Sequence, residues 1–395
     1  MKTQKTQKTQ MLRLSLLALA GFFLANCSAR DIVQEANPSL DPNPLTVDST
    51  SLKSGVDPLA AQQWNLDRIL AKGLTSNDGS KRIVVAVIGT GVDYTHEDLA
   101  GNIYINRNEW KSLTPGAQDS RDGTDDDGNG YVDDFIGYDF VENDGLPFDR
   151  NGAGTSIAGV LGAVSNNSKG ITGLVPNVSI LPIRCVDSSG HILIPNLFKA
   201  LKYALDMKVD VVLLHTPSYE FGSSAGNPEL RQTMADLERQ MLKVSIRGLE
   251  KAGIPIVASA GNTGPFVGKS NSLMVELSTS SNVVVVTSVD KADTVPFVAT
   301  FSGERVHTSA PGTEILTTIP GNKYGPVSST SVAAAHVAGA IALAVDRQFG
   351  KKEVRRLVEA FVQPAASDTV EALKFKVIGG NRLNVPKYLK YLEGN

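Results

Sequence analysis

The stretch Arg82-Ile83-Val84-Val85-Ala86-Val87-Ile88-Gly89-Thr90-Gly91 decides the fold class of this chain of 395 residues. Residues 82–88 are nearly all apolar, and glycines follow directly, which predicts a strand buried on both faces. Similar runs occur at 178–186, 210–214, 255–258 and 282–288, and helical patterns at 195–207 and 228–252 lie between them. Strands alternating with helices predict an α/β fold of three layers, α/β/α, around a mostly parallel central sheet.

The composition supports a folded body and excludes some functions. Hydrophobic residues make up 42% of the chain, and 38 basic against 41 acidic side chains leave a net charge of −3. Because there is no basic surplus, we expect no nucleic-acid partner. The two cysteines permit at most one disulfide, which excludes a disulfide-stapled scaffold. The run at 331–345, rich in Ala, Val and Gly, predicts a helix buried on all sides.

The first 26 residues have the layout of an export signal. Lys2, Lys5, Lys8 and Arg13 precede an apolar run at 14–25, which is too short to span a membrane. The run ends in Leu24-Ala25-Asn26-Cys27, which resembles a bacterial lipobox, although Asn26 departs from the usual small residue. We therefore expect a lipoprotein-type signal peptide at 1–26, lipidation of Cys27 and a tether at 27–56. The alternative is ordinary signal cleavage after Ala29, which would give a secreted or periplasmic protein.

The glycines after the first strand also invite a dinucleotide-binding interpretation. Gly89 and Gly91 match the first two glycines of that fingerprint, but Tyr94 stands at the third. The match is weak.

Four segments, in order, resemble the motifs of the subtilisin-like serine proteases, the subtilases or peptidase S8 family. The segment 84–99 looks like the strand of the catalytic aspartate, and 151–159 like the start of the catalytic-histidine helix. Ser259-Ala260-Gly261-Asn262 matches the oxyanion segment, and 329–339 matches the nucleophile helix. The resemblance implies one subtilisin-like peptidase domain over 57–395.

The resemblance places the serine nucleophile at Ser331 and the oxyanion asparagine at Asn262, but the catalytic base and its orienter are missing. The histidine position is Ala153 and the aspartate position is Gly89. A serine hydroxyl needs an imidazole to accept its proton and a carboxylate to orient that imidazole. We therefore expect Ser331 to be a poor nucleophile, while Asn262 and the Ser331 N–H remain as donors for a carbonyl or carboxylate.

Further departures surround these positions. Ser329 replaces a family glycine, and Pro217 lies in a segment that resembles a wall of the specificity pocket. His215, in the same segment, is a candidate displaced base; the alternative is a histidine that is satisfied at a strand end, because no carboxylate partner is identifiable. His336 matches a family histidine on the nucleophile helix, and we expect it to be structural.

Two acidic segments predict calcium sites. Asp125, Asp127, Asn129 and Asp133 lie at positions one, three, five and nine of an EF-type loop with Gly130 at six. The twelfth position is Ile136, so the bidentate glutamate is missing, although Asp134 or Asp139 is a possible substitute. The alternative is a solvated acidic loop. A second site, implied by the resemblance, pairs Asp98 with Asn167. Calcium at either site would be structural, because the ligands are hard oxygens.

Together these features predict an exported, lipid-anchored protein of the bacterial cell envelope that is proteolytically inactive. We expect it to bind an extended peptide or protein segment in the former substrate cleft, and to meet the membrane through its lipid. One alternative is an active serine endopeptidase that uses Ser331 with a displaced base. Another is a structural envelope lipoprotein whose cleft is idle.

Overall fold

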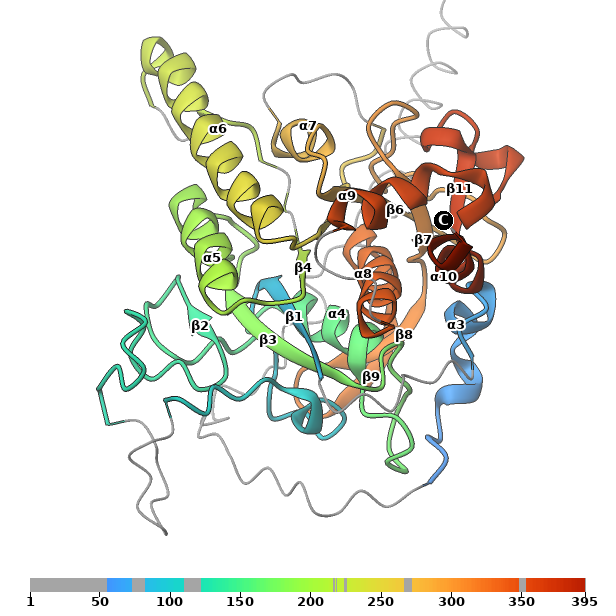
Figure 1. The fold of residues 1–395 in the computed structure, drawn as a ribbon, viewed down its shortest axis with the longest axis horizontal. Helices are drawn as coiled ribbons and strands as arrows, with labels where there is room; N and C mark the ends of the chain where they lie inside the picture. Colours follow the sequence, from blue (N-terminus) through green and yellow to red (C-terminus); the bar gives the residue numbers. More distant parts are fainter. Residues whose placement is uncertain are drawn as a thin grey trace, which may run out of the picture.

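The central sheet has nine strands in the order β10-β11-β7-β6-β5-β4-β1-β3-β2 (Figure 1). The computed structural model describes residues 55–72, 82–109, 122–215, 217, 219–223, 226–265, 272–347 and 353–394. All neighbouring strands in this sheet run parallel except β10 and β11. The strands are β1 (Ile83–Gly89), β2 (Tyr138–Asp139), β3 (Val178–Arg184), β4 (Val211–Leu214), β5 (Ile256–Ser259), β6 (Val283–Val289), β7 (Thr308–Pro311), β10 (Ser367–Thr369) and β11 (Asn381–Leu383). β8 (Ile315–Ile319) and β9 (Lys323–Val327) form a separate antiparallel hairpin.

Alternate residues of the central strands enter two different cores. In β1, Val85 and Val87 belong to the core that contains α8, whereas Ala86 and Ile88 belong to the core that contains α5 and α6. A strand with apolar side chains on both faces is stable only when each face is covered. The predicted three-layer α/β/α arrangement with a mostly parallel sheet is therefore confirmed.

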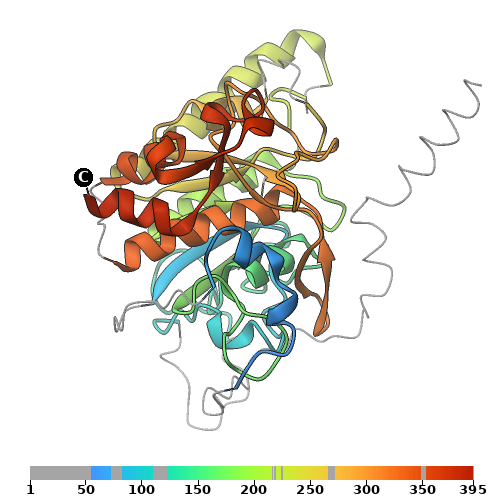
Figure 2. The same cartoon turned by 90° about the vertical axis from the view of Figure 1, so that its right-hand side faces the viewer.

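Helices cover both faces of the sheet (Figures 1 and 2). One core takes its helical residues from α5 (Ile194–Asp206), α6 (Pro228–Lys251) and α7 (Leu273–Ser278). The other takes them from α3 (Trp64–Arg68), α4 (Ala153–Gly162), α8 (Thr330–Asp346), α9 (Val354–Glu359) and α10 (Val385–Gly394). Short 3-10 turns occupy Ala60–Gln62, Ala100–Asn102, Ala360–Val362, Pro364–Ala366, Glu371–Leu373 and Ile378–Gly380.

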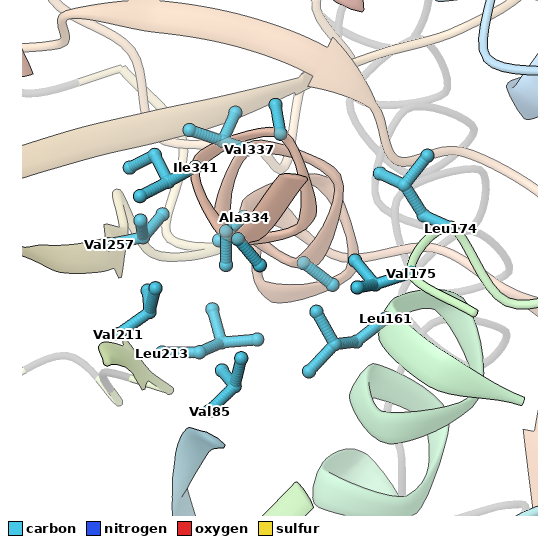
Figure 3. Close-up of a cluster of buried hydrophobic side chains, with 14 of the residues drawn as sticks. Val85, Leu161, Leu174, Val175, Val211, Leu213, Val257, Ala334, Val337 and Ile341 are labelled. Carbon is cyan, nitrogen blue, oxygen red and sulfur yellow. The ribbon is translucent and has the colours of Figure 1, made fainter. Parts of the chain in front are cut away.

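The helix α8 is the centre of one core, as its composition predicts. Every residue from Thr330 to Ala344 is buried. Figure 3 shows Ala334, Val337 and Ile341 of this helix facing strand residues such as Val257, with Leu174 on another side. A Cβ on Gly339 would lie 2.5 Å from the Leu174 side chain, so the small residues are what allow this close packing.

Most of the predicted N-terminal signal and tether lies outside the described residues. This holds for the signal peptide at 1–26, for Cys27 and for the tether up to residue 54. At the end of the predicted tether, the Gly55 N–H already donates to the Asn166 carbonyl at 2.9 Å. In the part of the chain that the structure describes, no helix has the length and apolar character needed to cross a membrane.

Candidate functional site

The candidate site lies at the carboxyl ends of the central parallel strands. Gly89 ends β1, His215 follows β4 directly, and Asn262 lies three residues beyond β5. In the sheet, β1 lies between β3 and β4, so the chain after β1 continues first on one side of this strand and then on the other. Such a reversal of strand order is where open α/β sheets bind ligands. Ser331 is in the first turn of α8, which packs across β4 and β5.

The nucleophile position is in contact with an imidazole, although the expected histidine position is alanine. The His215 Nδ1 lies 2.7 Å from the Ser331 Oγ. The backbone N–H of His215 donates to the Ile88 carbonyl at 2.9 Å, which continues the parallel pairing of β4 with β1. This pairing fixes the position of the His215 side chain. Of the two interpretations of His215 from sequence, the geometry supports proximity to the nucleophile.

The imidazole of His215 lies against the position where the family aspartate is expected. A Cβ built on Gly89 would be 3.0 Å from the His215 Cβ and 3.4 Å from its Cδ2. A side chain at position 89 would therefore crowd the imidazole. Ala153, at the expected histidine position, is the first residue of α4. Glycine at 89 and histidine at 215 are thus sterically matched.

Among the described residues, no carboxylate orients the imidazole of His215. Burial lowers its pKa to about 4, and no acidic group in the described residues offsets that shift. Two carboxylates near α4 are engaged elsewhere. Asp149 accepts hydrogen bonds from the N–H groups of residues 151, 152 and 155, and Asp93 accepts from the Gly321 N–H. His215 is therefore a neutral and weak base at pH 7.

The two donors that the sequence predicts for a carbonyl converge on the chain's own hydroxyl. The Ser331 N–H donates to the Ser329 Oγ at 3.0 Å, and the Asn262 Nδ2 donates to the same oxygen at 3.2 Å. The Thr330 N–H donates to the Asn262 Oδ1 at 3.0 Å, which fixes the orientation of the amide. The sequence singles out Ser329 only as a departure from glycine, and its position on these donors comes from the fold.

Another histidine, His336 of α8, has hydrogen-bond partners at both ring nitrogens inside the core. The His336 Nδ1 lies 3.0 Å from the Val332 carbonyl, and its Nε2 lies 2.8 Å from the Asn65 Nδ2. Burial lowers the pKa of His336 to about 4. The neutral ring satisfies both neighbours, which is a structural arrangement.

The acidic loop holds its own backbone with most of the predicted calcium ligands. Asp125 accepts from the N–H groups of Asn129 and Gly130, at 3.0 and 2.7 Å. The Asn129 Oδ1 accepts from the Tyr131 N–H at 2.8 Å, and an Asp133 carboxylate oxygen accepts from the Gly123 N–H at 3.2 Å. Asp125, Asn129 and Asp133 thus shape the loop in this structure.

A tighter acidic cluster lies beside this loop. Glu109, Asp127 and Asp134 each offer a carboxylate oxygen, and these oxygens lie within 4.8 Å of one another. Only Asp127 belongs to the predicted ligand set. Asp134 is one of the two possible substitutes, whereas Asp139 forms an ion pair with Arg184 at 2.5 Å. The sequence analysis missed Glu109, because it lies outside the loop motif.

Glu109 and Asp134 are buried, and their surroundings disfavour the charged forms. Burial raises the pKa of Glu109 to about 7 and that of Asp134 to about 6. The Glu109 Oε1 accepts from the Asp127 N–H at 2.9 Å, but its Oε2 has no partner within the described chain. A buried carboxylate oxygen without a partner is costly, and a hard cation satisfies it. The all-oxygen donor set fits calcium at the Glu109 Oε2, whereas the Asp134 oxygens already accept hydrogen bonds from the side chains of Asn106, Asn129 and Tyr203.

The second predicted calcium pair is brought together as a hydrogen bond. The Asn167 Nδ2 donates to the Asp98 Oδ1 at 2.7 Å, and the Ile171 N–H donates to the Asp98 Oδ2 at 2.9 Å. Asp57, which the sequence analysis did not select, accepts from the N–H groups of Asn166 and Asn167. Burial raises the pKa of Asp98 to about 6. These bonds satisfy both Asp98 oxygens without an ion.

A buried serine at a helix N-terminus, an adjoining imidazole and a nearby asparagine also occur together in serine hydrolases. The sequence profile of the subtilase family matches residues 80–377. The chain is 32% identical over 281 residues to a thermophilic serine proteinase of Bacillus sp. strain AK1, which covers 71% of this chain and 56% of that protein. It is 30% identical over 300 residues to thermitase of Thermoactinomyces vulgaris, covering 76% of this chain and 84% of thermitase.

A third relative is subtilisin-like protease 1 of Plasmodium berghei, at 28% identity over 349 residues, 83% of this chain and 53% of that protease. The chain spans about half the length of this protease and of the Bacillus proteinase. The chain belongs to the subtilase family.

Proposed function

We propose that this subtilase is proteolytically inactive and binds peptide. The observation that carries the proposal is the set of groups that contact the Ser331 hydroxyl and its backbone N–H. Its only imidazole neighbour in the described residues, His215, has a lowered pKa and no carboxylate partner. The Ser331 N–H is also occupied by the Ser329 Oγ. Proton transfer and oxyanion stabilisation are therefore both impaired, and these are the two main contributions to acyl transfer.

Peptide binding is supported by a cavity that adjoins the site. The Thr300 N–H donates to the Gly261 carbonyl at 2.8 Å, which places the segment after Thr300 beside Asn262. The next residue, Phe301, lines a cavity of about 580 Å³. The other lining residues are Pro265, Ser302, Gly303, Glu304, Arg305, Lys374 and Phe375. Phe301 and Phe375 give this cavity an apolar part, and Glu304, Arg305 and Lys374 give it a charged part. A mixed lining of this kind fits a peptide side chain, and two of the relatives are named as a serine proteinase and a subtilisin-like protease.

The test of inactivity compares the full-length purified protein with thermitase on casein and on a fluorophosphonate probe. We expect casein hydrolysis to be at least about 10⁴-fold slower than with thermitase, because the base and its orienter are absent. Hydrolysis within tenfold of thermitase, abolished by Ser331→Ala, would contradict the proposal. Peptide-library capture tests the binding function, since an idle cleft of a purely structural lipoprotein should enrich no sequence.

A second candidate, an active endopeptidase, is favoured by the 2.7 Å contact between Ser331 and His215. In this function the Ser331 hydroxyl donates to the imidazole, which then removes its proton. Fluorophosphonate labelling of the wild type, lost in both Ser331→Ala and His215→Ala, identifies this function. Labelling lost only in Ser331→Ala points to a reactive serine without a base.

We propose that the chain is exported and anchored to the bacterial envelope through lipid on Cys27. The support is the charge layout and the lipobox-like sequence at 24–27. Expression in a bacterial host with a radiolabelled fatty acid should label the wild type. A Cys27→Ala variant should carry no label and should appear in the soluble periplasmic or secreted fraction.

We also propose calcium as a structural ion, held by Glu109, Asp127 and Asp134. The support is the close approach of their oxygens and the unpartnered Glu109 Oε2. Bound calcium would neutralise buried negative charge. It would also connect Glu109 to the acidic loop through Asp127 and Asp134. The Asp98 and Asn167 pair is a second, weaker candidate for the same ion.

A further inference from the structure

Ser329 makes two hydrogen bonds that have different explanations. Its extended backbone, with φ −165° and ψ 148°, and its bond from the Ser331 N–H are those of an ordinary helix N-cap. Capping does not account for the second bond, from the Asn262 Nδ2. Asn262 is not part of α8, and its side chain is exposed. The hydroxyl therefore collects a donor from outside the helix.

The geometry at Ser329 is that of an occupied two-donor site. A backbone N–H and a side-chain amide aimed at one oxygen, beside a serine nucleophile, are the arrangement that stabilises a carbonyl or carboxylate oxygen. Here the distances to that oxygen are 3.0 and 3.2 Å, and the oxygen belongs to Ser329. The Asn262 amide cannot turn away without losing the bond from the Thr330 N–H to its Oδ1.

We propose that the Ser329 hydroxyl is a built-in occupant of this site, which a ligand oxygen has to displace. The inference rests on the proposed function in taking the cleft as a peptide site. It adds that Ser329 sets the ligand chemistry: peptides held through other groups bind, whereas a terminal carboxylate gains nothing from the two donors. Removal of the hydroxyl converts the cleft into a site for a peptide carboxylate.

The decisive variant is Ser329→Gly. Glycine also serves as an N-cap and accepts extended backbone, so α8 should remain folded. The matched control is Ser328→Gly, one residue earlier, where the exposed hydroxyl accepts only from the Glu314 N–H at 2.9 Å among the described groups. A Ser329→Thr variant keeps a hydroxyl at the same position and should behave as the wild type.

The probes are acetyl-Ala-Ala-Phe with a free carboxylate and the same peptide as its terminal amide. Each is titrated into the ¹⁵N-labelled full chain, and the Ser331 N–H and Asn262 side-chain signals are followed. In the wild type we expect the two peptides to bind with similar affinity. In Ser329→Gly the carboxylate should bind about tenfold more tightly than the amide, and both signals should shift. Adding Asn262→Ala to Ser329→Gly should remove that preference.

The proposal would be overturned if the ratio of carboxylate to amide affinity is the same in Ser329→Gly as in the wild type. It would also be overturned if Ser329→Gly binds neither peptide. An equal gain in Ser328→Gly would likewise overturn it. The outcome is independent of the activity test. Casein hydrolysis by the wild type would refute inactivity and leave this ratio to be scored. Library peptides that bind the wild type while the ratio stays unchanged would refute only the role of Ser329.

Discussion

Two polar regions of this molecule treat their buried groups in opposite ways. Around Ser331, the site groups contact other groups of the chain. His215 lies against Gly89, and the Ser329 hydroxyl accepts hydrogen bonds from the Asn262 side chain and from the Ser331 N–H. Around the acidic loop, a buried oxygen of Glu109 has no partner in the described residues. The site groups of the first region are bonded within the chain, whereas in the second the Glu109 Oε2 is left without a partner among the described residues. A buried polar group indicates a ligand only when the fold does not itself satisfy it.

The largest expected effect sharpens this contrast at the acidic loop. Calcium at about 100 times its Kd should stabilise the native protein by about 3 kcal/mol, because the ion binds only the folded state. The melting temperature should rise by about 6 °C on adding calcium to chelator-treated protein. In Glu109→Gln the shift should disappear, since the unpartnered oxygen is then gone.

The matched control is Asp126→Asn, which makes the same charge change in the loop but lies outside the cluster of Glu109, Asp127 and Asp134. It should retain the calcium-dependent shift. An equal loss in both variants would attribute any effect to the general acidity of the loop. A melting temperature indifferent to chelator would refute the ion altogether.

A smaller effect tests whether the site around Ser331 is filled. Gly89→Ala places a methyl group 3.0 Å from the His215 Cβ in a buried strand. Overpacking of this kind should cost about 2 kcal/mol in the free energy of unfolding, measured in urea. The double variant with His215→Gly should recover part of that loss, because glycine lacks the contacting Cβ, whereas His215→Ala keeps it. Gly226→Ala, where a Cβ meets nothing within 4 Å, serves as the control and should be close to neutral.

The smallest effect is the pH dependence that follows from the buried histidines. The pKa of His336 is about 4 in the folded protein, below the usual value of about 6.5. Between these values the unfolded chain binds more protons, so stability is full above pH 6.5 and falls as the pH decreases toward 4. His336 should contribute a loss of about 1 kcal/mol between pH 7.5 and 5.5. A His336→Gln variant with an unchanged slope would contradict this contribution.

The strands and the buried helix were predictable because their signal is local. The runs of Val and Ile at 83–88 and 283–286 carry their burial in their composition, and so do the alanines of α8. The expected strand and helix ends differ from the observed ones by one or two residues, because end positions depend on caps and neighbours. The acidic loop was recognisable as a motif, yet Glu109 was not, since it lies 16 residues before Asp125 and outside the spacing of the motif.

The site around Ser331 was predictable in identity but not in arrangement. Motif order alone identifies Ser331, Asn262, Ala153 and Gly89 as the positions of interest, and it predicts that two catalytic side chains are absent. The sequence marks His215 as a candidate displaced base, but it does not show whether the imidazole contacts Ser331, because the two residues are 116 positions apart. Their contact depends on the pairing of β4 with β1 and on α8 packing across β4.

The sequence by itself determined the α/β/α architecture and the subtilase relationship, and it predicts the loss of the catalytic histidine and aspartate. These follow from residue types at single positions and from local hydrophobic patterns. Only the tertiary structure decided which groups contact the polar side chains of the two sites. His215, Ser329 and Glu109 acquire their partners from distant segments, and the free energy of a buried polar group depends on which atoms the fold brings within hydrogen-bonding distance.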